Sequence, residues 1–227
     1  MAGDPAQPEP GRDGAVSAAV KSRRMCRDFL PDPLAAGTVD GLLDLARRAP
    51  SAGFTQGLAF VTLERPSAGG GGDGAPDPVA AYWDLTLPAP RRSEFAWPGL
   101  LAAPALVTLW VRPQAWVERY ARADKTRAQL GGGEEAWPVP YWWVDAGAVV
   151  QNLLLLAEAD ELGALFFGMF EHEPAVAAHL AVPAGWRGVG TVALGRPAPG
   201  GRRPSRSARA GRPPLAEQRH RGRWAAR

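Results

Sequence analysis

Three arginines near the N-terminus have the type and spacing to hold a phosphate. Arg23, Arg24 and Arg27 lie in the segment KSRRMCR, directly after apolar residues at helical spacing. On the end of a helix, residues i and i+4 share a face, so Arg23 and Arg27 would present two planar guanidinium groups together. A phosphate or a polyol suits this pair, and a solvated basic face is the alternative.

Two further segments carry groups that can contact a flat, polar ligand. Residues 50–56, PSAGFTQ, combine small residues, which allow close backbone approach, with hydroxyl and amide side chains. A plain connection between a helix and a strand is the alternative. Residues 163–168, GALFFG, form an aromatic strand bounded by glycines, which either packs on a ring system or belongs to the core.

The signatures of other chemistries are missing from the sequence. It has no G-x-G-x-x-G after a strand, no G-K-S/T phosphate loop and no G-x-S-x-G elbow. His172, His179 and His220 lack the spacing of metal ligands, and Cys26 has no Cys or His nearby. We therefore expect a cofactor, rather than a side chain, to carry any chemistry.

Apolar patterns predict the elements that must position these segments. Helices are expected from Ala15 into the arginine cluster, from an N-cap at Thr38, and over 115–122, 141–162 and 174–180. Strands are expected at 59–63, 104–111, within 162–170 and at 188–194. The result is a mixed α and β domain with four or five strands, in which helix 141–162 is apolar on nearly all sides and therefore central.

Composition divides the 227 residues into three parts. Residues 1–14 are expected to be a disordered lead, 15–197 the folded domain and 198–227 an arginine-rich extension. Residues 67–78, rich in glycine, are expected to be a loop. A single cysteine and the lack of an apolar leader favour the cytoplasm, and no apolar run reaches the roughly 18 residues of a membrane helix.

The net charge of +3 contains a strongly basic tail, with ten arginines and one acidic residue after position 195. Such a tail suits either a phosphorylated cofactor or a nucleic acid. Nucleic-acid binding ranks last, because Trp224 is the one aromatic residue among these arginines.

Read in order, the segments resemble the FMN-dependent nitroreductase family. The likeness rests on RRMCRDFLPDP, ARRAPSAGFTQ, D-A-G-x-x-x-Q-N-L-L-L-x-A followed by LGALFFG, and VALGRPAP, and it spans about residues 20–224. It implies an α+β fold, a three-layer α/β/α sandwich with a mostly antiparallel central sheet. It also implies an intertwined homodimer with one FMN at each of two subunit interfaces.

The resemblance assigns site residues by position. The cofactor-binding set it implies is Arg23, Arg24, Met25, Arg27, Pro50, Ser51, Phe54, Gln56, Phe166, Phe167, Gly168, Met169, Arg209 and Arg212. Met25 stands where the family has Ser, and Phe54 where it usually has Asn, so two polar contacts to the flavin are missing. Tyr141, Trp142 and Trp143 are candidates for the substrate pocket, with a core or dimer contact as the alternative.

The activity implied is ping-pong hydride transfer from NADH or NADPH through FMN to a nitroaromatic, a quinone or a similar flat acceptor. Three alternatives stay open: an oxygen-dependent enzyme that fragments FMN to dimethylbenzimidazole, a reductase using a deazaflavin donor, and a flavin-binding protein without turnover. The first shares RRxxRxFLPDP and Phe54 but has Gln-Pro-Trp where this chain has Gln56-Gly57-Leu58.

Overall fold

The structure is a computed structural model that describes residues 14–66, 76–202, 208 and 210–224. Nearly all of the predicted lead, most of the glycine-rich loop and the candidate Arg209 lie outside these residues.

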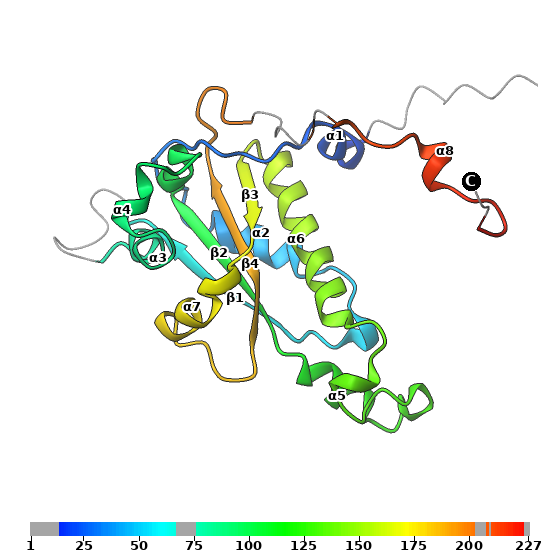
Figure 1. The fold of residues 1–227 in the computed structure, drawn as a ribbon. Helices are drawn as coiled ribbons and strands as arrows, with labels where there is room; N and C mark the ends of the chain where they lie inside the picture. Colours follow the sequence, from blue (N-terminus) through cyan, green and yellow to red (C-terminus); the bar gives the residue numbers. More distant parts are fainter. Residues whose placement is uncertain (1–13, 67–75, 203–207, 209, 225–227) are drawn as a thin grey trace, which may run out of the picture.

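Four strands form one antiparallel sheet in the described part of the chain. They are β1 (Leu58–Glu64), β2 (Ala105–Val111), β3 (Gly163–Phe167) and β4 (Arg187–Gly195), in the order β1-β2-β4-β3. All seven residues of β2 are buried, as expected for an inner strand covered on both faces. The four predicted apolar runs are therefore confirmed as strands (Figure 1).

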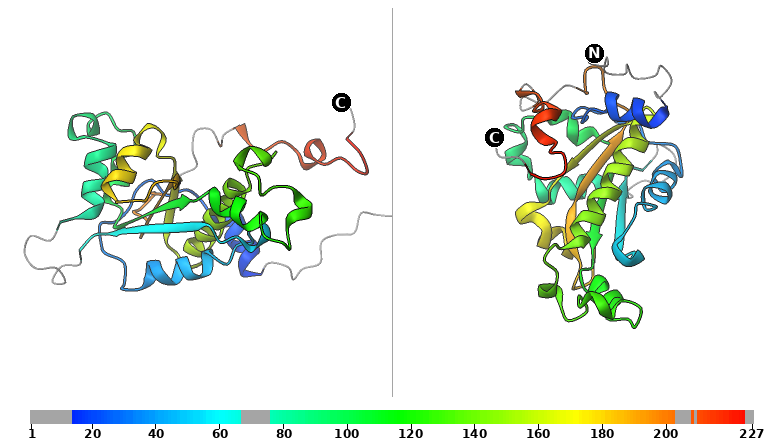
Figure 2. Two further views of the ribbon diagram at one scale, coloured as in Figure 1. Left: turned by 90° about the horizontal axis from the view of Figure 1, so that it is seen from below. Right: turned by 90° about the vertical axis from the view of Figure 1, so that its right-hand side faces the viewer.

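Helices surround the sheet (Figures 1 and 2). The helices are α1 (Ala15–Ser22), α2 (Thr38–Ala46), α3 (Pro78–Thr86), α4 (Ala89–Arg92), α5 (Gln114–Tyr120), α6 (Tyr141–Ala159), α7 (Glu173–His179) and α8 (Leu215–Gln218). Short 3₁₀ turns are η1 (Ala52–Phe54), η2 (Pro98–Ala102), η3 (Thr126–Ala128), η4 (Glu134–Ala136) and η5 (Phe170–His172).

Alternate residues of β2 enter two different hydrophobic clusters, because successive side chains of a strand point to opposite faces. Val107 and Leu109 pack with α2, α5 and α6. Leu106 and Trp110 pack with α3, α7 and the turn around Leu100. The sheet thus has a helical cover on each face, with one hydrophobic cluster under each cover.

Three sequence expectations are wrong in detail. The first helix ends at Ser22 instead of running into the arginines, because the Arg24 guanidinium donates to the carbonyls of Lys21, Ser22 and Arg23. Thr38 is the first residue of α2, and its N-cap is Gly37 in a left-handed conformation. Helix α3 was not predicted at all.

Helix α6 is central, but one of its faces is open. It packs on the sheet, on α2 and on α1, whereas Val144 is 52% exposed and Gln151 is exposed. A side chain added at Gly147 would meet no atom within 4 Å. Among the described residues, nothing covers this helix at Val144, Gly147 and Gln151.

Candidate functional site

A cleft of about 330 Å³ lies between the end of β3 and helix α3. This volume is within the range of small-molecule sites. We call it the aromatic cleft, and it is lined by Arg27, Tyr82, Trp83, Thr86, Leu87, Phe95, Trp97, Leu100, Leu165, Phe166, Phe167, Gly168, Met169, Phe170 and His172. All four residues that the sequence assigned to the ring contact, 166–169, lie here together with Arg27.

Packing across the sheet fixes the walls of the aromatic cleft. Trp83 stacks on Phe167, with ring centroids 5.7 Å apart and planes 15° from parallel. The Tyr82 hydroxyl lies 2.8 Å from the Thr191 hydroxyl of β4, which joins α3 to the sheet. Burial raises the pKa of Tyr82 to about 12, so this hydroxyl stays neutral. The cleft is therefore a rigid slot between flat side chains.

Several hydrogen-bond donors around the aromatic cleft have no partner. The indole Nε1 of Trp83 is buried and unpaired within the described residues. The backbone N–H groups of Gly168 and Met169 likewise make no hydrogen bond among these residues. Buried donors are nearly always satisfied, and an orphan costs about 1–3 kcal/mol. The N–H groups of Gly168 and Met169, two lining residues of the cleft, are therefore available to a polar ligand.

The predicted arginine cluster lies in an extended segment that runs beside β3. Met25 forms a parallel bridge with Ala164, and the guanidinium of Arg27 lies 5.4 Å from the Trp97 ring centroid. The expected shared helix face of Arg23 and Arg27 is therefore wrong. Arg23 is half-buried, and its Nη1 is buried without a partner in the described chain, so this guanidinium is a candidate to bind an anion. Arg24 is instead occupied in closing α1.

The predicted loop 50–56 is held at the other end of α6. The backbone N–H of Ala52 donates to Asp145 Oδ2 at 2.8 Å, and the same oxygen accepts from Trp116 Nε1 of α5 at 2.9 Å. Gln56 Nε2 donates to Ser51 Oγ at 2.9 Å. Phe54, with φ at +55°, is 80% exposed. The loop is tightly fixed, yet it presents an aromatic ring to solvent.

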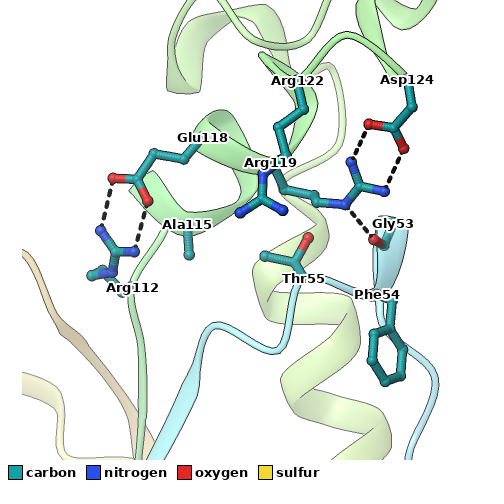
Figure 3. Close-up of a pocket in the computed structure, with 9 residues that line it drawn as sticks. All are labelled: Gly53, Phe54, Thr55, Arg112, Ala115, Glu118, Arg119, Arg122 and Asp124. Atoms are coloured by element: carbon teal, nitrogen blue, oxygen red, sulfur yellow. Dashed lines mark hydrogen bonds and ion pairs between the residues drawn. The ribbon is translucent and has the colours of Figure 1, made fainter.

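A second, polar cleft of about 450 Å³ separates this loop from α5 (Figure 3). We call it the arginine cleft, and it is lined by Gly53, Phe54, Thr55, Arg112, Ala115, Glu118, Arg119, Arg122 and Asp124. Of its lining, the sequence pointed to the turn 53–55 but not to the arginines, which belong to no recognised motif.

Two ion pairs occupy most of the charge in the arginine cleft. Arg112 makes two hydrogen bonds to Glu118, at 2.9 and 2.8 Å, and Arg119 makes two to Asp124, at 2.9 and 2.7 Å (Figure 3). The hydrogen bond from Arg119 lowers the pKa of Asp124, and that from Arg112 lowers the pKa of Glu118. Both carboxylates are therefore ionised at neutral pH.

The predicted flavin-binding residues thus fall into two separate groups. Arg27 and residues 166–169 line the aromatic cleft at the end of β3, whereas residues 50–56 lie by the N-terminal turns of α6, where Ala52 contacts Asp145. A helix of 19 residues is about 28 Å long. The aromatic cleft and the cleft lined by the turn 53–55 share no lining residue in one chain.

The remaining candidates are placed as follows. Trp142 is buried in the core beside Trp116 and Trp137, whereas Tyr141 and Trp143 are 44% and 37% exposed. Arg212 is exposed on the C-terminal segment, which passes α1 and extends away from the sheet (Figures 1 and 2). Trp83 and Trp97 were not assigned individually, and only their place in the aromatic-rich stretch 82–97 signals them.

Within the ranges that the structure covers, no three His, Cys, Asp or Glu side chains are grouped to hold a metal ion. No helix among the described residues is long and apolar enough to cross a membrane.

Comparison with solved structures identifies the fold. NfrA2 of B. megaterium is 17% identical, with a TM-score of 0.65 over 93% of this chain and 76% of that one. A protein described as the oxidoreductase containing FMN is 19% identical, with a TM-score of 0.64 over all of both chains. A nitroreductase-like protein from Streptococcus mutans is 18% identical, with a TM-score of 0.63 over 87% of this chain and 96% of that one.

A comparison with curated proteins finds no match. The model of one family, described as the nitroreductase family, matches residues 20–196, which is most of the chain. The antiparallel sheet, its covering helices and this match agree with the resemblance seen in the motifs. The chain belongs to the nitroreductase family.

Proposed function

We propose that the protein is an FMN-dependent oxidoreductase, which takes a hydride from NADH or NADPH and passes it to a flat acceptor such as a nitroaromatic or a quinone. The observation that carries the proposal is the flat aromatic cleft with its unpaired donors, Trp83 Nε1 and the N–H groups of Gly168 and Met169. Membership of the nitroreductase family and the likeness to an FMN-containing oxidoreductase support it.

The residues present fit FMN. The chemistry that FMN supplies when bound is acceptance and donation of a hydride at its ring. Phe166 and Phe167 offer flat apolar surface to the ring, and the free N–H groups of Gly168 and Met169 suit its polar edge. Arg23, with a buried and unpaired Nη1, suits the phosphate dianion. Arg27, unlike Arg23, lines the aromatic cleft itself.

We propose further that the site is completed by a second copy of the chain, in an intertwined homodimer of three-layer subunits. Loop 50–56 of one chain contributes no residue to the lining of its own aromatic cleft, but a partner's loop can supply Ser51, Phe54 and Gln56. The open face of α6 gives such a partner an apolar contact surface. The C-terminal segment that carries Arg212 extends away from its own body, which suits a contact with another subunit.

The proposed reaction needs no separate dinucleotide-binding fold, because the donor and the acceptor would use the same place in turn. Tyr141 and Trp143 are exposed beside the loop end of α6 and would contact either flat molecule in the dimer. Trp142, buried in the core, would position them rather than touch substrate. We place this reaction in the cytoplasm, where reduced nicotinamides are formed and where a single free thiol, that of Cys26, is ordinary.

The visible absorption spectrum of the purified protein tests the proposal. We expect flavin bands that bleach anaerobically with NADH or NADPH and return with a nitroaromatic. A yellow protein that neither donor bleaches would favour the deazaflavin, flavin-fragmenting or non-catalytic alternatives. A colourless protein that takes up no added FMN would refute the proposal.

Two variants test the phosphate contact. Arg23→Ala and Arg27→Ala should lose FMN on gel filtration while the far-UV spectrum is unchanged. Arg127→Ala is the matched control, because Arg127 is exposed on η3 and lines neither cleft. Full flavin occupancy in both variants would contradict the assignment.

A further inference from the structure

We propose that the arginine cleft is a binding site for an anionic group, a carboxylate or a phosphate, on the molecule that reacts at the flavin. Arg122 is the residue that would hold this group. The inference rests on the proposed function, since it adds a charge requirement to the flat substrates named there.

The walls of the arginine cleft are preformed. The side-chain Nε of Arg119 donates to the Gly53 carbonyl at 2.8 Å, and the backbone N–H of Arg112 donates to the Gly57 carbonyl at 3.0 Å. A side chain at Gly53 would come within 2.8 Å of Tyr120, and one at Gly57 within 2.4 Å of Trp116. Loop and helix therefore pack as closely as backbone allows. A site that is rigid before binding loses little entropy when a ligand enters.

The charges in the arginine cleft do not balance. Its lining contains three arginines and two carboxylates, and each carboxylate is held by two hydrogen bonds from its own arginine. Arg122 makes no side-chain hydrogen bond or ion pair to any described residue, and its side chain points into the space beside Arg119 and Thr55 (Figure 3). One guanidinium is thus left for an anion, with the paired arginines raising the local potential.

Residues on the turn 53–55 connect this charge to the proposed flavin. Gly53 and Thr55 line the cleft beside Arg122, while the ring of Phe54 projects away from the arginines (Figure 3). Phe54 is the position that the family places against the flavin. In the proposed dimer, one side of this turn therefore contacts the flavin ring through Phe54, and the other side lines the cleft that binds the anionic group. This arrangement suits a flat molecule with an anionic substituent at its edge.

Steady-state kinetics of the FMN-loaded protein with a charged and a neutral acceptor test the site. The probes are 4-nitrobenzoate and 4-nitrobenzamide, which differ in charge but hardly in shape. In Arg122→Gln we expect the KM for 4-nitrobenzoate to rise about tenfold and that for 4-nitrobenzamide to change less than twofold. Arg122→Lys should recover part of the difference, and Arg127→Gln should behave as wild type.

The same variants identify the source of the anionic group. If the KM for NADPH or NADH rises in Arg122→Gln and neither acceptor is affected, the cleft binds a phosphate of the donor, and inorganic phosphate should then compete with the donor in wild type only. If every KM is unchanged, the proposal is wrong.

A direct binding measurement tests the arginine cleft whether or not the protein catalyses the proposed reaction. Should the wild type turn over no acceptor, isothermal titration with 4-nitrobenzoate still reports on the cleft. Binding by wild type and by Arg127→Gln, with at least tenfold weaker binding by Arg122→Gln, would support the site even though the reaction is different. Equal binding by all three proteins, or none, would overturn it.

Discussion

The two clefts of this chain are built in opposite ways. The aromatic cleft gathers apolar side chains from α3, η2, β3 and η5, and several of its polar donors lack partners among the described residues. The arginine cleft is polar, comes from a short turn and one helix, and has most of its charges paired. Among the described residues, the aromatic cleft therefore leaves several hydrogen-bond donors to a ligand, and the arginine cleft leaves only the guanidinium of Arg122.

This difference separates the task of holding a ring from that of selecting what reaches it. An apolar slot with a few unpaired donors gains most from a flat molecule that satisfies those donors. A rigid polar cleft with one unpaired guanidinium gains little from apolar surface and much from a matching anion. In the proposed dimer, the two tasks would meet where the clefts of different chains come together.

The largest effect on this contrast should come from Asp145→Ala. Asp145 is 5% exposed, and one of its oxygens accepts from both Ala52 N and Trp116 Nε1. Its loss leaves two buried donors unpaired, so we expect the free energy of unfolding to fall by about 3 kcal/mol. Urea unfolding followed by far-UV circular dichroism measures this change.

Asp145→Asn is the control, because its carbonyl oxygen can accept both hydrogen bonds and should cost about 1 kcal/mol. We also expect loop 50–56 and α5 to lose amide-exchange protection in Asp145→Ala, while α3 and β4 keep theirs. An equal loss of amide-exchange protection around both clefts would show that the two clefts are not independent.

The next effect concerns the aromatic cleft and depends on pH. The pKa of Tyr82 is raised by burial from 10.0 to about 12, so its neutral form is favoured in the folded state. The stabilisation is complete below pH 10 and is lost as the pH rises from 10 to 12. The expected loss over this interval is about 2 kcal/mol, of which about half should be seen by pH 11. Urea unfolding at pH 9, 10 and 11 measures it.

In Tyr82→Phe the alkaline loss should be smaller, although the variant starts less stable because the Thr191 hydrogen bond is gone. Burial also raises the pKa of the Cys26 thiol, which adds a loss of the same sign above pH 9. The Cys26→Ala substitution should therefore be introduced into both wild type and Tyr82→Phe before their alkaline unfolding is compared. An equal alkaline slope in wild type and in Tyr82→Phe would show that this hydroxyl is not what senses pH.

Elements with a local cause were predictable from the sequence. The strands were found because apolar runs such as AFVTL and GVGTVAL are bounded by turn residues, and α6 because it is long and apolar. Helix α3 had a signal that was passed over: Asp77 caps it by accepting from Val79 and Ala80, and Pro78 is its first residue. The neighbouring glycines masked that signal.

Elements of the site with a non-local cause were not predictable. The arginine cleft depends on Asp145 reaching Ala52 across 93 positions of sequence. The aromatic cleft depends on Trp83 reaching Phe167 across the sheet. Trp142 shows the same limit, since residues 141–143 are consecutive aromatic residues and only the packing of α6 decides which one is buried. The role of every named cofactor residue stays a prediction.

The smallest effect is expected for anion binding by the arginine cleft when the pH changes within the physiological range. It contrasts with the loss of stability that Tyr82 should cause at alkaline pH. The carboxyls of Glu118 and Asp124 have pKa values lowered by hydrogen bonds from Arg112 and Arg119, so their ion pairs are present above pH 4.5 and weaken only as the pH falls further. No histidine lines the arginine cleft. Because no group there changes charge between about pH 5.5 and 8, the affinity of wild type for 4-nitrobenzoate, measured by isothermal titration, should be constant over this range. The acid of that probe is fully ionised throughout, so a change larger than twofold would mean that a titrating group outside the lining, rather than Arg122 alone, sets the charge of the cleft.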